Sequence, residues 1–147
     1  MANHILMVLT NAIEGQDDEF NDWYNNRHLF DVVNLEGFVA AQRHRMDSPF
    51  AEGPQPLIHQ YLAIYEIPEG QLDIAKKSLH EAIAKRNKAL AEGLPTDFPR
   101  SEAMALDFAG YWFTQISDRV DEVAVESLLR AQILDRSEGT RFGTLSL

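Results

Sequence analysis

Several segments of this chain are apolar on both sides of the strands that they predict. Every residue of Ile5–Leu9 is apolar, and within 59–67 Tyr61, Ala63 and Tyr65 occupy one face of the predicted strand while further apolar residues occupy the other. A strand without a polar face is typical of a sheet that is covered on both sides. The fold must therefore supply two covers for its sheet, one for each face.

Amphipathic helices are predicted between these strands, because apolar residues recur there at helical spacing. The expected strands cover residues 3–11, 38–46, 59–67 and 107–116, and the expected helices cover 17–35, 68–91 and 117–136. The first six elements follow the split βαβ order of a ferredoxin-like α+β domain. We therefore expect a βαββαβ domain over residues 1–118, with both of its helices on one face of a four-stranded sheet. An extra C-terminal helix and tail at 119–147 should pack on this domain or on a partner subunit.

Short polar residues, proline and glycine indicate where the helices end. An aspartate at 17–18 is expected to cap the first helix, and a polar residue at 117–118 the third. Pro68 is expected in the first turn of the second helix, where a missing N–H costs nothing. Gly37 follows the first helix at the position that favours a C-terminal glycine.

The second face of the sheet needs its own cover. Apolar area contributes roughly 25 cal/mol per Å² when it is buried, so exposing a whole sheet face would forfeit many kcal/mol. A homodimer that packs sheet against sheet about a two-fold axis is the simplest cover. The C-terminal helix is the alternative, since it can lie on the same face within one chain.

Composition and charge exclude several classes of function. The 147 residues include 23 acidic and 13 basic ones, a net charge of -10, so phosphate backbones and anionic membrane surfaces are repelled. The chain has no cysteine, which excludes disulfides, zinc–thiolate sites and cysteine nucleophiles. No run approaches the roughly 20 apolar residues of a membrane span, and no signal peptide is expected. We expect a cytoplasmic protein without nucleic-acid or membrane partners.

Three short motifs resemble the EthD-like branch of the dimeric α+β barrel superfamily. They are the run Trp23–Leu29 (WYNNRHL), the glycine and phenylalanine of Glu36–Phe38, and the arginine within Gln42–His44. The resemblance covers roughly residues 3–116. It implies a ferredoxin-like protomer that dimerises through its sheets and holds a pocket between each sheet and its own helices. Relatives include muconolactone isomerase, plant polyketide cyclases, cofactor-free monooxygenases and haem enzymes, so the resemblance supports the fold far more than the reaction.

Three residues are candidates for catalysis. His28 lies on the helix stripe that should face the sheet, and a histidine there can transfer a proton near neutral pH; the alternative is a buried histidine with a structural hydrogen bond. His4, on the first strand, stands where the more weakly similar polyketide cyclases carry a histidine. Tyr61 can orient a carbonyl or phenolic ligand, or can serve only in core packing.

Six further residues are candidates for substrate binding. The aromatic residues among them can form flat walls for a ring, although aromatics at helical spacing are more often plain core. Arg43 can bind a carboxylate with two hydrogen bonds, or can pair with a surplus acidic side chain. Neighbouring cations should favour the neutral form of His44. The six candidates are Trp23, Tyr24, Arg43, His44, Tyr65 and Trp112.

These residues suit acid/base chemistry on a small aromatic, phenolic or ketone compound. The reactions expected are isomerisation, cyclisation or C–C cleavage, none of which requires a cofactor, and no metal-ligand spacing is present. The alternative is a non-catalytic dimeric binding or stress-related protein that sequesters a hydrophobic metabolite. A haem-binding relative is a third option and would need an axial histidine such as His80. The loops 47–57 and 93–106 are expected to close over the pocket, with Phe50 and Phe98 as apolar lids.

Overall fold

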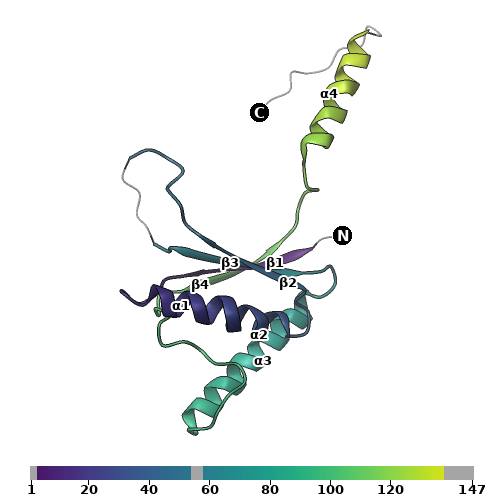
Figure 1. The fold of residues 1–147 in the computed structure, drawn as a ribbon. Coiled ribbons are helices and arrows are strands. Elements are labelled where there is room, and N and C mark those ends of the chain that lie inside the picture. Colours follow the sequence, from purple (N-terminus) through teal and green to yellow (C-terminus); the bar gives the residue numbers. More distant parts are fainter. Residues whose placement is uncertain (1–2, 54–57, 138–147) are drawn as a thin grey trace. The chain divides into compact units, whose positions relative to one another are not determined.

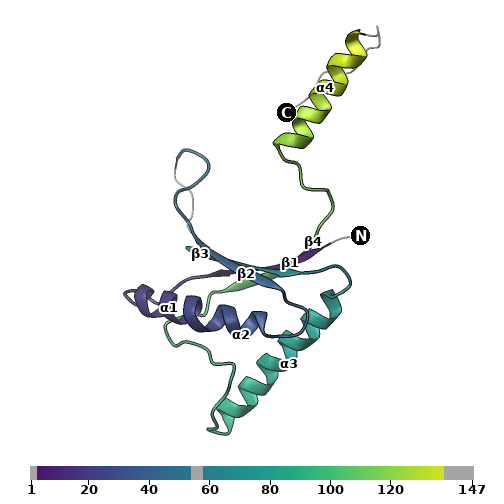
Figure 2. The same cartoon turned by 45° about the vertical axis from the view of Figure 1, so that its right-hand side comes forward.

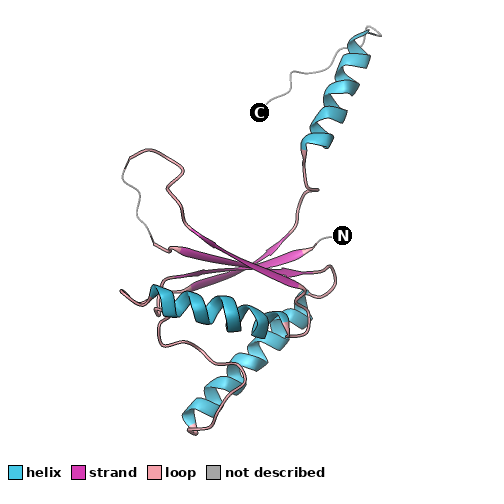
Figure 3. Ribbon diagram, in the orientation of Figure 1, coloured by secondary structure: helices cyan, strands magenta, loops and turns pink. Residues whose placement is uncertain are grey.

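The computed structural model describes residues 3–53 and 58–137, which belong to two compact units, residues 1–115 and 116–147. The first unit contains β1 (His4–Thr10), α1 (Asp17–Trp23), the π-helical turn η1 (Tyr24–His28), α2 (Leu29–Val33), β2 (Ala40–Arg45), β3 (Tyr61–Ile67), α3 (Leu72–Ala91) and β4 (Ala109–Thr114), and the second contains α4 (Glu122–Ser137). Figure 3 colours these helices and strands by type.

The four strands form one antiparallel sheet in the order β2-β3-β1-β4. Figures 1 and 2 show α1, α2 and α3 together on one face of this sheet. This is the ferredoxin-like βαββαβ arrangement, so the α+β fold class predicted from the element order is confirmed.

The register shows which residues of each strand face the helices. Leu6 of β1 stands opposite Tyr65 of β3 and Trp112 of β4, and these three side chains lie on the helix-covered face. Tyr65 is buried there together with Phe20 of α1, so the hydrophobic core lies between this face and the helices. The other face, which we call the open face, carries Tyr111 and Phe113, which are 52% and 45% exposed.

Gly37 lets the segment before β2 pass close to α3. Its φ is 97°, a conformation that disfavours a side chain, and a Cβ built on it would lie 2.7 Å from the backbone nitrogen of Ala75. Ala75 is fully buried, and Ser78 one turn later donates a hydrogen bond to the Glu36 carbonyl oxygen at 2.6 Å. The helix ends earlier than predicted, with its cap at Asn34, so Gly37 does not terminate it and instead lets the segment before β2 approach α3 closely.

Several predicted helix ends are wrong in detail. Asp17 lies within the first turn of α1 rather than at the cap, which is Gln16 without a side-chain hydrogen bond. Pro68 lies in a turn before α3, because its carbonyl oxygen accepts a hydrogen bond from the Gln71 N–H and the helix begins only at Leu72.

The second unit is a single helix in the described part of the chain. Its cap is Asp121, whose carboxylate accepts a hydrogen bond from the Ala124 N–H at 2.9 Å, rather than the predicted residue at 117–118. Leu128, Ile133 and Leu134 of α4 are exposed within this unit. Packing of the segment 119–147 on the domain or on a partner subunit stays a prediction, and residues 138–147 lie outside the described residues.

None of the helices in the described ranges is long and apolar enough to cross a membrane.

Replacing Gly37 with alanine should destabilise the fold by about 2–5 kcal/mol. The positive φ costs a non-glycine residue about 1–2 kcal/mol, and the clash with the Ala75 backbone adds an overpacking cost of about 1–3 kcal/mol. Gly15→Ala is the matched control, since Gly15 has a φ of 80° but no atom within 4 Å of its Cβ position. Urea denaturation measures both variants. Equal losses of stability would show that the approach to Ala75 is not tight.

Candidate functional site

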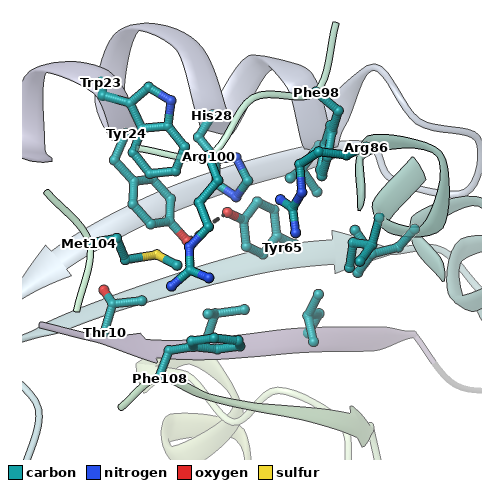
Figure 4. A pocket seen from close by; sticks show the side chains of 15 residues that line it. Thr10, Trp23, Tyr24, His28, Tyr65, Arg86, Phe98, Arg100, Met104 and Phe108 are labelled. Carbon is teal, nitrogen blue, oxygen red and sulfur yellow. Dashed lines mark hydrogen bonds between the residues drawn. The ribbon is translucent and has the colours of Figure 1, made fainter. Parts of the chain in front are cut away.

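A cavity of about 130 Å³ lies between the helices and the covered face of the sheet. Figure 4 shows its lining side chains, which come from the sheet on one side and from the helices and a loop on the other. The sheet contributes Leu6, Val8, Thr10 and Tyr65; the first helical segment contributes Trp23, Tyr24, His28 and Val32; α3 contributes Leu79, Ile83 and Arg86; and the following loop contributes Phe98, Arg100, Met104 and Phe108.

The π-helical turn η1 brings Trp23 and His28 together. In an α-helix, side chains five residues apart point roughly 140° away from each other. In η1 the Leu29 N–H instead donates to the Tyr24 carbonyl oxygen, the five-residue hydrogen bond of a π-helix. The Trp23 and His28 rings consequently stack with their centroids 4.6 Å apart. Such π-helical turns often occur at functional sites.

His28 is held neutral in this cavity. Burial, and to a lesser extent the positive charges of Arg86 and Arg43, lower its pKa from 6.5 to about 4. Its Nδ1 is buried and has no hydrogen-bond partner among the described residues. The structural hydrogen bond considered from the sequence is therefore not made at Nδ1, and at neutral pH the imidazole can accept a proton or offer one from its N–H.

Tyr24 and Tyr65 form a buried pair of hydroxyls beside His28. Their oxygens are 2.9 Å apart, and the Tyr24 ring meets the imidazole edge-on with the centroids at 4.9 Å. Burial raises the pKa of both phenols. Both hydroxyls therefore keep their protons at neutral pH, and the pair can donate one hydrogen bond outward after satisfying the bond between them.

Arg86 and Arg100 bring two guanidinium groups to the same cavity (Figure 4). Burial lowers the pKa of Arg86, and the like charge of Arg100 lowers it further. Arg86 lies over the Phe98 ring at 5.7 Å, and Arg100 lies over the Phe108 ring at 5.5 Å. The Nε of Arg86 and one terminal nitrogen of Arg100 are buried without a hydrogen-bond acceptor in the described chain.

Three of the predicted residues line a second depression, at the β2 edge of the sheet. It is formed by Asn21, Asn25, Arg43, His44, Arg45 and Tyr61. Tyr61 donates a hydrogen bond to Asp17 at 2.5 Å and accepts one from Asn21 at 3.2 Å. Arg43 lies over the Tyr24 ring at 4.1 Å and donates to Asn25 at 2.8 Å, so its guanidinium packs behind the cavity wall.

His4 and Trp112 lie on the covered face of the sheet but do not line the cavity. His4 Nδ1 is 2.9 Å from the Thr114 hydroxyl, at the end of β1 away from Thr10. Trp112 packs against Phe38 at 6.3 Å and lies under Lys76 at 5.8 Å. Of the nine predicted site residues, the cavity therefore brings together His28, Trp23, Tyr24 and Tyr65.

The two predicted lids differ. Phe98 is buried and its ring lies 5.5 Å from that of His28, so the loop 93–106 does close one side of the cavity. Phe50 is fully exposed and does not line the cavity, so its expected role as a lid is wrong. Residues 54–57 of its loop lie outside the described residues.

No group of three histidine, aspartate or glutamate side chains in the described ranges lies close enough to hold a metal ion. His80, the candidate for an axial haem ligand, is exposed on α3 and does not line the cavity.

The site residues predicted from the sequence do not include the two arginines of the cavity, Arg86 and Arg100. Arg86 interrupts the apolar stripe of α3 between Ile83 and Leu90, and a charged residue at such a position is a signal of a buried polar role. Arg100 has no such signal, because it lies in an irregular loop whose path only the tertiary fold determines.

Comparisons with known proteins give limited likenesses. No protein-family model matches the chain. Core atranone cluster (CAC) protein 1 of Stachybotrys chlorohalonatus (strain IBT 40285) is 35% identical over 81 residues, 55% of this chain and 27% of that protein. The chain thus matches about a quarter of this relative's length. A crystal structure from Shewanella loihica PV-4 shows a protein provisionally assigned as a monooxygenase. Its superposition on this chain has a TM-score of 0.43 and 13% sequence identity, and it covers 82% of this chain and 99% of that one.

Proposed function

We propose that the chain is an enzyme of acid/base chemistry that moves a proton on a small aromatic, phenolic or ketone compound without a cofactor. The observation that carries this proposal is the neutral imidazole of His28, whose unpartnered Nδ1 is buried at an aromatic-walled cavity. Isomerisation, cyclisation and C–C cleavage all begin with such a proton transfer.

The proton transfer can be written with this site's own groups. His28 removes a proton from the carbon next to a carbonyl group, and the C–H electrons form a C=C bond as the carbonyl π electrons move to oxygen. The hydroxyl pair of Tyr24 and Tyr65 donates a hydrogen bond to the resulting enolate oxygen. Where the compound is a β,γ-unsaturated ketone, the anion is a dienolate, and return of the proton from the imidazolium to its γ-carbon moves the C=C bond and completes an isomerisation.

A pKa of about 4 makes His28 a weak base in the ligand-free protein. The negative charge that develops on the substrate during the reaction compensates for this weakness. The enolate is an anion that forms next to the imidazole, and an adjacent negative charge raises the pKa of a histidine. The base is therefore strengthened in the transition state, where stabilisation accelerates the reaction.

The remaining predicted residues take other parts in the proposal. Tyr65 replaces Tyr61 as the phenol that orients the ligand, because Tyr61 is bonded to Asp17 and Asn21 outside the cavity. Arg43 acts as a positioning residue through the Tyr24 ring that it covers. His4, His44 and Trp112 do not line the cavity and have no part in the proposed reaction.

We also propose an EthD-like homodimer, located in the cytoplasm, that forms through the open face of the sheet. Support comes from Tyr111 and Phe113, which stand side by side on β4 with their centroids 6.4 Å apart and are about half exposed. Ile5 and Met7 of β1 face the same side. An apolar sheet face of this kind indicates an interaction surface.

His28→Gln should lower the rate of proton transfer by roughly 10²–10⁴-fold. The probe is phenylacetone, whose benzylic protons exchange with D2O, and proton NMR measures the exchange rate. With wild-type protein the rate should rise with pH through about 4 and then level off, because only the neutral imidazole accepts a proton.

His80→Gln is the matched control, since it removes an exposed imidazole from α3 and should leave the exchange rate unchanged. An exchange rate that His28→Gln does not alter would contradict the catalytic role. Phenylacetone binding without any accelerated exchange would favour the alternative of a protein that sequesters small molecules.

Sedimentation velocity at micromolar concentration tests the dimer. A two-fold mass is expected for the wild type, and Phe113→Glu should shift it toward a single chain by placing a charge on the open face. A single-chain mass for the wild-type protein would contradict the proposed dimer.

A further inference from the structure

The cavity holds more positive charge than the described chain compensates. Arg86 and Arg100 both line it, and neither forms an ion pair with a carboxylate in the described ranges. Arg27, on the nearby α1–α2 segment, is by contrast paired with a carboxylate, because its Nε lies 2.9 Å from Asp31. The chain has 23 acidic residues, so the missing partner does not reflect a shortage of acids.

The unpaired nitrogens lie on the buried part of each arginine. The Nε of Arg86 and a terminal nitrogen of Arg100 are buried and lack an acceptor among the described residues. The rings of Phe98 and Phe108 face the two guanidinium groups, but aromatic faces offer only part of the stabilisation that an anion would supply. Both side chains are only partly buried, but a buried cationic nitrogen without an acceptor is costly, so a cavity with one on each of two arginines is suited to an anion.

The volume and walls of the cavity limit the rest of the ligand. About 130 Å³ is close to the roughly 150 Å³ of an apolar cavity that holds one benzene molecule. Leu79, Ile83 and Phe98 supply apolar wall in the same cavity as Arg86. These dimensions fit a single ring.

We propose that this cavity binds a single-ring aromatic carboxylic acid, with Arg86 and Arg100 holding the carboxylate. The inference deepens the proposed function by naming the substrate class of the same cavity, and it rests on that proposal only for the reaction. Guanidinium groups match the two oxygens of a carboxylate, which can accept a hydrogen bond from each arginine.

A carboxylate suits this cavity better than a phosphate monoester does. A phosphate monoester carries more than one negative charge at neutral pH and would have to lose a stronger hydration shell among the apolar walls. A carboxylate balances the repulsion between the two arginines with one negative charge. Its presence would also raise the pKa of His28 from its low value in the free cavity, because its negative charge would offset that of Arg86, one of the two cations that lower this pKa.

Isothermal titration calorimetry with benzoate and benzamide tests the inference. The two probes have nearly the same shape and differ in charge, so the wild-type protein should bind benzoate at least about 10-fold more tightly. Arg86→Gln and Arg100→Gln should each weaken benzoate binding by roughly 10- to 100-fold and leave benzamide binding nearly unchanged, since each removes a charge-assisted hydrogen bond.

Lys88→Gln is the matched control, because it removes an exposed positive charge from the same helix as Arg86 and should not affect either probe. Equal binding of benzoate and benzamide by the wild-type protein would overturn the inference, whatever the variants do. Failure of both probes to bind would overturn it as well. Tighter arginine-dependent binding of phenyl phosphate than of benzoate would overturn the assignment to a carboxylate.

The outcomes also separate this inference from the proposed function. Accelerated exchange of phenylacetone without a preference for benzoate would reject the carboxylate and leave the proton-transfer proposal standing. An arginine-dependent preference for benzoate without accelerated exchange would establish the anion site and reject catalysis.

Discussion

The stacking of the His28 imidazole on the Trp23 indole organises the site of this protein. The rings meet at 4.6 Å because one turn of the first helical segment is π-helical, which aligns side chains five residues apart. Without that turn, the two rings would point in different directions. The imidazole also meets the Tyr24 ring edge-on at 4.9 Å and lies 5.5 Å from the Phe98 ring, and this aromatic group forms one wall of the cavity.

Burial and charge act on this imidazole in the same direction. The helix layer removes His28 from water, while Arg86 and Arg43 disfavour a second positive charge beside them. The tyrosine pair remains protonated for a related reason, since a buried phenolate is costly. The site therefore combines a neutral base, a neutral hydroxyl donor and two fixed cations, a combination suited to forming and stabilising an anion from a neutral group.

The sequence predicts the fold well because periodicity is a local property. Alternation within 59–67 places Tyr61 and Tyr65 on the covered face, and the i+4 series through Phe20, Tyr24 and Val32 predicts the buried stripe of the first helix. Alternation does not indicate position along a strand, however. His4 and Tyr61 both lie on the face that the helices cover, yet the cavity lies elsewhere along the same strands, and Arg100 reaches it only through a loop whose path the sequence pattern does not encode.

The most direct test of this account is the pKa of His28 in the protein without ligand. NMR titration of the imidazole resonances, with His28 assigned by its loss in a His28→Gln spectrum, measures it. The account predicts a midpoint near pH 4, well below those of exposed histidines. A midpoint near 6.5 would show that the imidazole is hydrated and not held neutral by burial and the arginines, and the proposed site would lose its basis.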